Sequence, residues 1–142
     1  MEPDTIMVRL LGGFSVRFGE HELDSLPPQA VSLLSYLIVH RDRPQTRDLL
    51  AGRFWSELPE DRARKRLSNS LWQIKNATTD AGMPELLVTS PSSVQVTKQY
   101  PISVDAEEFE SQLSDFEREL RTRQLRGVLA DRLSSVVSGY PG

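Results

Sequence analysis

Hydrophobic positions along the chain first alternate and later recur at helical spacing. Residues 7–12 and 14–18 are short apolar segments separated by Gly12-Gly13. Within them apolar and more polar positions alternate, as in half-buried strands, the apolar ones being Val8, Leu10, Phe14, Val16 and Phe18. Gly19-Glu20 indicates a turn, and residues 21–23 a third short strand. The start of the chain therefore predicts an antiparallel β-meander.

Three segments with helical spacing follow, joined by short polar loops. Pro28 suits the first position of a helix whose apolar stripe is Ala30, Leu33, Leu34, Leu37 and Ile38. Thr46 is a good N-cap for a second helix over residues 47–55, with an expected buried side of Leu49, Leu50, Phe54 and Trp55. A third helix over residues 60–78 has the stripe Ala63, Leu67, Leu71 and Ile74.

Gly82 and Pro84 end the third helix, and strands at residues 86–89 and 94–97 follow. The polar residues 90–93 between them predict a β-hairpin with a small tip. Three helices followed by a hairpin is the element order of a winged helix-turn-helix. We therefore predict an α+β fold for residues 6–104: a winged helix-turn-helix with an N-terminal antiparallel β-meander, three helices and a C-terminal β-hairpin wing, followed by two additional helices.

A different pattern begins at Asp105, which forms a loose capping box with Glu108. The first additional helix has the apolar stripe Ala106, Phe109, Leu113, Phe116 and Leu120. The second covers residues 125–137, with apolar positions Leu125, Val128, Leu129, Leu133, Val136 and Val137, and ends at residues 138–142. Two amphipathic helices cannot bury both faces alone. We therefore expect residues 105–142 to pack on the preceding domain, on a partner or on further helices.

The formal net charge of −3 hides a local excess of positive charge. Residues 41–75 hold nine basic side chains against five acidic ones, whereas the flanking thirds are acidic. This is the pattern of a local electrostatic footprint on an otherwise acidic chain. The chain contains no cysteine, so a disulfide framework and a thiol nucleophile are excluded. No apolar run reaches the length of a membrane span, and a cytoplasmic location with no membrane partner is expected.

The outer face of the third helix is basic in its first half and polar afterwards, which suits a DNA major groove. Arginine and lysine bond guanine O6 and N7, and asparagine pairs with adenine. The residues we expect to contact bases are Arg62, Arg64, Lys65, Ser68, Asn69 and Trp72. Two alternatives stay open: a Trp72 ring packed at the domain edge, and an ordinary solvated surface helix.

Backbone phosphates should be held from both sides of this helix. Thr46 and Arg47 stand at the start of the second helix, where free N–H groups and the helix dipole favour an anion. Thr46 is also expected to cap the helix, which is compatible with a phosphate contact, and Arg66 contacts either a phosphate or an acidic neighbour. The complete set of expected phosphate contacts is Thr46, Arg47, Arg66, Gln73, Lys75, Asn76, Ser92 and Ser93.

Four segments, taken in order, resemble the N-terminal part of the SARP class of bacterial transcription activators: LLGGFSVRFGEHEL, QAVSLLSYLIVHRDRPQTRDLLAGRFW, RARKRLSNSLWQIKNA and VDAEEFESQL. The resemblance covers the chain from about residue 7 to its end. It implies an OmpR-like winged helix followed by a tetratricopeptide-like bacterial transcriptional activator domain. It also implies binding of double-stranded promoter DNA at direct repeats, by two protomers in tandem, with recruitment of RNA polymerase. In solution we expect a monomer or a weak homodimer.

The chain departs from this family in two places. OmpR-like wings commonly carry an arginine and glycines at the tip, whereas residues 90–93 carry no cation, so we expect a weaker wing contact through hydroxyls. The family's activator domain is also longer than residues 105–142, so we expect the chain to be either part of a longer regulator or a natural short form.

Enzymatic activity is not expected. His21 and His40 stand in unrelated contexts, and no spacing of acidic residues resembles a metal loop. Gly12-Gly13 is not followed by the lysine and hydroxyl residue of a phosphate-binding loop. No cofactor or metal is therefore expected. The competing interpretation is a winged helix that serves as a protein–protein interaction module without DNA binding.

Overall fold

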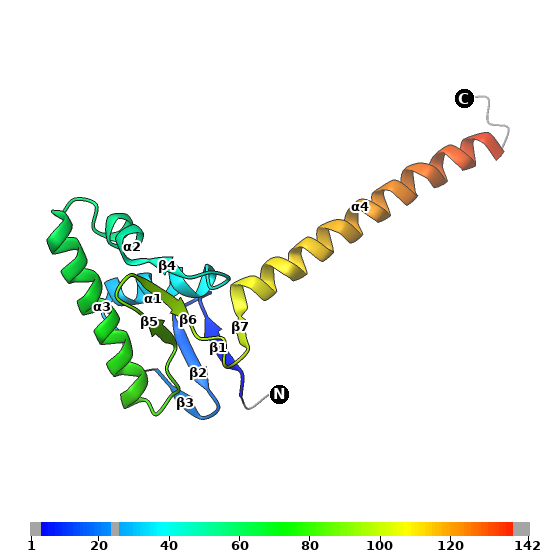
Figure 1. Cartoon of the computed structure of the whole chain (residues 1–142). Helices are drawn as coiled ribbons and strands as arrows, with labels where there is room; N and C mark the ends of the chain where they lie inside the picture. Colours follow the sequence, from blue (N-terminus) through cyan, green and yellow to red (C-terminus); the bar gives the residue numbers. More distant parts are fainter. Residues whose placement is uncertain (1–3, 24–25, 138–142) are drawn as a thin grey trace. The chain divides into compact units, whose positions relative to one another are not determined.

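The computed structural model describes residues 4–23 and 26–137. Within these ranges the protein is of the mixed α+β class, as expected, with four helices and two sheets (Figure 1). The chain divides into two compact units, Met1–Val104 and Asp105–Gly142. Among the described residues, no helix combines the length and the apolar character needed to span a membrane.

The predicted meander is confirmed as part of a four-stranded sheet with the order β3-β2-β1-β7. β1 (Ile6–Arg9) pairs antiparallel with β2 (Ser15–Phe18), which pairs antiparallel with β3 (His21–Glu22). Val8 lies opposite Val16, and both are buried, as is Ile6. The alternating pattern of β1 therefore places one face in the core and leaves Met7 and Arg9 outside.

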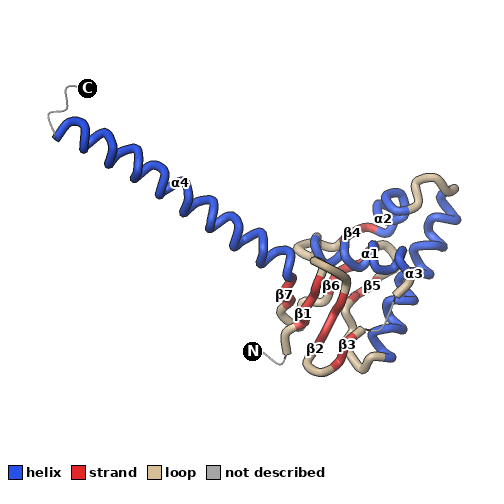
Figure 2. Tube along the Cα trace, turned by 180° about the vertical axis from the view of Figure 1, so that it is seen from behind, coloured by secondary structure: helices blue, strands red, loops and turns tan. Residues whose placement is uncertain are grey.

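The fourth strand of this sheet was not predicted. β7 (Ile102–Val104) runs parallel to β1, with Ile6 opposite Ile102 and Val8 opposite Val104. Both views place it beside β1 (Figures 1 and 2). Three residues after a proline carry too little pattern to indicate a strand, because the partner that defines β7 lies at the other end of the unit. The last strand of the unit is thereby joined to its first.

Three helices lie between β3 and β5 in the sequence. They are α1 (Pro28–Val39), α2 (Arg47–Phe54) and α3 (Glu60–Asp80). The expected stripes of α1 and α3 are confirmed, since every member is buried. In α2, Leu50 and Trp55 are buried and Phe54 is half-buried, but Leu49 is 54% exposed, so its predicted burial is wrong. The buried side of this short helix is centred on Leu50 and Ala51, and the 100° step per residue turns Leu49 outward.

The second sheet has the order β4-β6-β5. β5 (Leu87–Thr89) and β6 (Ser93–Val96) form the predicted antiparallel hairpin. The short strand β4 (Gln45–Thr46) was not predicted, and it pairs antiparallel with β6 just before α2 begins. The hairpin is therefore attached directly to the start of α2.

α3 ends where Gly82 predicted. Gly82 has a φ of 72°, its N–H donates to the Thr79 carbonyl at 3.1 Å, and the Met83 N–H donates to the Thr78 carbonyl at 2.9 Å. These two bonds form a Schellman motif, in which a left-handed glycine is favoured. A Cβ at this position would lie 3.1 Å from Nδ1 of His21, so a side chain here would require the His21 ring to shift by a few tenths of an ångström.

The second unit contradicts the prediction of two helices. α4 (Asp105–Val137) is one continuous helix of 33 residues. The apolar positions change face between Leu120 and Leu125, which suggested a break, but residues 121–124 contain no proline or glycine, and three of the four, Arg121, Arg123 and Gln124, are good helix formers. An ion pair of 2.8 Å between Arg123 and Glu119 spans this point. Side chains from Val128 onward, and the predicted end at residues 138–142, lie outside the described residues.

Candidate nucleic-acid interface

The outer face of α3 is open along its length. All six expected base-contacting residues are exposed: Arg62, Arg64, Lys65, Ser68, Asn69 and Trp72. Trp72 is 61% exposed, which argues against the alternative that its ring packs at the domain edge. Beneath this face the buried stripe fixes the rotation of the helix. The hydrophobic core therefore determines which polar side chains α3 presents.

Ser68 lies at the centre of this face, because it lines three separate hollows. The first, the cationic hollow, has a volume of about 680 Å³ and is bordered by one leucine and polar or basic residues of α3: Leu58, Arg62, Lys65, Arg66, Ser68 and Asn69. It gathers three cations beside one amide. Arg66, which was expected to reach a phosphate or an acidic neighbour, borders this hollow and is exposed.

The second hollow, the hairpin hollow, lies where α2, α3 and the hairpin tip meet. Its volume is about 330 Å³, and it is lined by Arg47, Asp48, Arg64, Leu67, Ser68, Pro91 and Ser92. The third, the α3–β5 groove, measures about 530 Å³ and contains Trp72 and Lys75 on one side and Val88 and Thr89 on the other. Arg47 and Ser68 line both of these hollows, so the hairpin and α3 form one connected surface.

Among the six residues expected to contact bases, Arg64 is notable because its side chain makes two ion pairs. Its Nη2 lies 2.7 Å from Oδ1 of Asp48 on α2 and 2.9 Å from Oε1 of Glu60 one turn earlier on α3. All three side chains are more than half exposed. Sequence patterns gave no sign of the Asp48 contact, because the two residues meet only when α2 packs against α3. Arg64 therefore joins the two helices in this structure.

Arg47 fastens the hairpin to α2. Its backbone N–H donates to the Ser92 carbonyl at 2.9 Å, and its Nε donates to the Ser90 carbonyl at 2.8 Å. The side chain is half-buried and faces both the hairpin hollow and the α3–β5 groove. An arginine has five N–H donors, so the bond from Nε does not exhaust the guanidinium.

Two of the N–H groups expected to hold an anion at the start of α2 already have partners. Thr46 is the N-cap, and its Oγ1 accepts from the Leu49 N–H at 3.2 Å. With Arg47 N–H bonded to Ser92, two N–H groups expected to face a phosphate are already engaged. The acidic Asp48 also lies in this first turn. Thr46 is therefore a helix cap here, the role that the sequence indicated beside its expected phosphate contact.

The hairpin tip is held by its own hydroxyl groups. Ser90 Oγ accepts from the N–H groups of Ser92 and Ser93 at 3.3 and 3.0 Å, and it lies 2.9 Å from Ser93 Oγ. Ser93 is half-buried, whereas Ser92 is exposed and lines the hairpin hollow. Of the two serines expected to contact phosphate, Ser92 is the better placed.

The remaining expected phosphate contacts, in the second half of α3, differ in exposure. Lys75 is exposed and lines the α3–β5 groove beside Trp72. Gln73 and Asn76 are half-buried. Lys65, Ser68, Trp72 and Lys75 are all exposed. Their spacing of three and four residues places them along one face of α3. Sequence reasoning missed the β5 side of the groove, because burial along β5 does not alternate: Leu87 is half-buried, whereas Val88 and Thr89 are both exposed.

Both histidines take part in packing contacts outside this surface. The ring of His21 lies against Gly82, and the ring centroid of His40 lies 4.4 Å from that of Tyr36. Across the described ranges, no group of three or more His, Cys, Asp or Glu side chains is placed to hold a metal ion. The concentration of polar groups and hollows on α3 makes it the principal candidate site.

Comparison with known proteins gave no further assignment: no family model, no curated protein and no solved structure matches this chain significantly.

Proposed function

We propose that residues 6–104 form a winged helix-turn-helix domain that binds double-stranded DNA in a sequence-dependent manner. α3 would lie in the major groove, and the β5–β6 hairpin would contact the adjacent backbone. The observation that carries this proposal is the exposed face of α3 centred on Ser68, which borders three hollows and is joined to the hairpin through Arg47. An α-helix fits the width of the major groove, and its cations and amides match base-edge acceptors and donors.

In this proposal, exposed residues in the first half of α3 and at its centre contact the base edges. Lys65 and Arg62 suit guanine O6 and N7, Asn69 suits adenine, and Ser68 bonds either donors or acceptors. Both carboxylate partners of Arg64 contact its Nη2, so Nε and Nη1 provide its donors for a base edge. Trp72 offers an apolar surface to a thymine methyl group or to a sugar. These roles are supported by exposure and by the hollows that the side chains share.

Phosphate binding falls mainly to residues at the margins of this face. Arg66 in the cationic hollow and Lys75 in the α3–β5 groove stand on opposite halves of α3. Arg47 reaches the same groove from α2, and Ser92 provides a hydroxyl from the hairpin tip. Because the tip carries no cation, the hairpin supplies the weaker part of the contact.

The ordered segments that resemble the SARP class support a more specific role. On that resemblance, the protein is a cytoplasmic bacterial transcription activator that binds direct repeats as two protomers in tandem and recruits RNA polymerase. Residues 105–142 would then begin its tetratricopeptide-like activator domain. No cofactor and no enzymatic activity belong to this proposal.

One observation favours a second candidate, a protein-interaction module. Trp72 and Val88 face the α3–β5 groove and are 61% and 57% exposed, which gives this groove apolar walls. A peptide side chain would fit such a groove as well as a deoxyribose would.

Selection of bound sequences from a random duplex pool, followed by a salt titration, separates the two candidates. Three phosphate contacts, from Arg47, Arg66 and Lys75, predict a slope of about −3 for log K against log salt. Asn69→Ala should relax preference at one or two base positions of the selected site, while Arg66→Ala should weaken all sequences equally. A chain that binds no duplex at low salt would support the protein-interaction module instead.

A further inference from the structure

α4 carries an exposed apolar stripe on its first half. Phe109, Leu113, Phe116 and Leu120 are 54%, 43%, 54% and 39% exposed, and they follow one another at spacings of four, three and four residues. This is the a and d spacing of a coiled-coil seam. Large apolar side chains gathered in a line on an otherwise polar helix mark an interaction surface.

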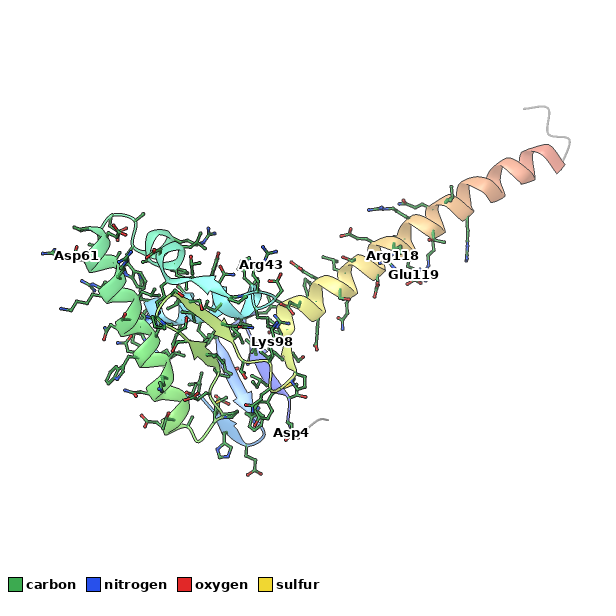
Figure 3. All side chains as sticks on the ribbon, viewed as in Figure 1. Asp4, Arg43, Asp61, Lys98, Arg118 and Glu119 are labelled. Carbon is green, nitrogen blue, oxygen red and sulfur yellow. The ribbon has the colours of Figure 1, made fainter. Side chains whose placement is uncertain are left out.

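The charges of α4 are divided along its length. Residues 105–117 contain six carboxylates and no basic side chain: Asp105, Glu107, Glu108, Glu110, Asp115 and Glu117. Residues 118–127 contain one glutamate and four arginines: Arg118, Arg121, Arg123 and Arg126. The change of sign falls at Arg118 and Glu119, which are labelled in Figure 3. The helix therefore has an acidic first half and a basic second half.

This division decides which partner fits the stripe. In a parallel pair of identical helices, acidic half would meet acidic half, which is repulsive. In an antiparallel pair with Leu113 opposite Phe116 of the other copy, Phe109 meets Leu120. The residues from Asp105 to Glu110 then lie level with residues 119–124 of the other copy, which include Arg121 and Arg123. The apolar stripe and the charge pattern are thus satisfied by the same arrangement.

We propose that α4 pairs with α4 of a second copy of this chain in antiparallel orientation, through Phe109, Leu113, Phe116 and Leu120. Such a contact is isologous, since each helix offers the same surface to the other. The ion pairs within α4, Arg118–Asp115 at 3.4 Å and Arg123–Glu119 at 2.8 Å, join exposed side chains and compete only weakly. The stripe spans about two heptads, so the dimer is weak and depends on its charges.

Sedimentation equilibrium of the whole chain, from micromolar to near-millimolar concentration, tests the surface. The wild-type chain should dimerise, and Leu113→Glu should stay monomeric. Ser111→Glu makes the same charge change on the opposite side of α4, so it should dimerise like wild type. Residue 113 is exposed, so unfolding is not expected, and circular dichroism would verify this. A monomer at every concentration, or a Leu113→Glu dimer as tight as wild type, would overturn the proposal. If the chain stays monomeric and the apolar stripe of α4 is nevertheless protected from solvent, the stripe binds the first unit of the same chain instead of a second copy.

Two measurements test the orientation. Added salt screens attraction in the antiparallel dimer and should weaken it several-fold, whereas a parallel dimer would become tighter. Because the chain has no cysteine, single cysteines can also be placed at will. Ala106→Cys and Arg123→Cys chains should cross-link with each other when mixed and oxidised, and neither should cross-link efficiently with itself. Dimers that tighten with salt, or self-linked Ala106→Cys dimers, would overturn the antiparallel pairing.

Discussion

The guanidinium of Arg64 lies 2.7 Å from the carboxylate of Asp48, so an arginine expected to read bases also joins α3 to α2. Glu60 holds the same nitrogen from the other side at 2.9 Å. Exposed ion pairs contribute little to stability individually. Both carboxylates contact Nη2, so Nε and Nη1 carry the donors of Arg64 that a DNA ligand can use. Asp48 thus lowers the net positive charge that Arg64 offers to the proposed DNA-binding surface.

Asp48→Asn should increase DNA affinity a few-fold. The change removes a negative charge beside the phosphate-binding surface and releases Arg64 from one of its two partners. The free energy of unfolding should change by less than about 1 kcal/mol, because the pair is exposed. Titration of a selected duplex would measure the affinity. Glu20→Gln removes the same charge in the β2–β3 turn and should leave DNA affinity nearly unchanged. An equal gain in affinity for Glu20→Gln would mean that the effect of Asp48→Asn comes from the net charge of the protein and not from Arg64.

Ser68→Glu should reduce DNA affinity at least about tenfold, because it places a carboxylate at the centre of the face on which all three hollows meet. Ser68 is exposed, so the thermal unfolding midpoint should stay close to that of wild type. The matched control is Ser32→Glu on the exposed side of α1. Equal losses for both variants would show that Ser68 lies outside the contact.

Lys75→Ala should lower the magnitude of the salt slope by about 0.9, the amount expected for one lost phosphate contact. Sequence preference should not change, because the contact is to the backbone. Lys98, labelled in Figure 3, is an exposed lysine that does not line the three hollows. Lys98→Ala therefore serves as the control, and a slope that changes only in that variant would move the phosphate contact away from the α3–β5 groove.

Leu67→Ala should destabilise the first unit by about 2–5 kcal/mol, since the side chain is 1% exposed and its removal leaves a cavity. Leu49→Ala removes the same atoms from a site that is 54% exposed and should cost less than about 1 kcal/mol. Chemical denaturation of both variants measures the difference. Similar midpoints would mean that the rotation of α3, and with it the reading face, is assigned incorrectly.

Periodicity in the sequence was sufficient to place the buried stripes of α1 and α3, and with them the outward direction of Asn69 and Trp72. Local chemistry was sufficient for the ends of helices, because Thr46 and Gly82 act within one turn. These features depend on neighbours close in sequence. They could therefore be predicted before any packing was known.

Features that depend on distant partners were missed. β7 and β4 exist only because β1 and β6 lie beside them, and the Arg64–Asp48 pair exists only because α2 crosses α3. The continuous α4 was missed for a different reason. A change in the apolar face was interpreted as a break, although residues 121–124 contain nothing that interrupts a helix.

The parallel pairing of Ile6 with Ile102 has a consequence for how the protein is made. β1 leaves the ribosome before β7, its neighbour in the finished sheet, which is synthesised only at the end of the first unit. Closing so long a loop is entropically costly, and contacts of this kind form slowly. The nascent chain must therefore hold β1 with one edge unpaired until Val104 has emerged, and the sheet can be completed only after that point.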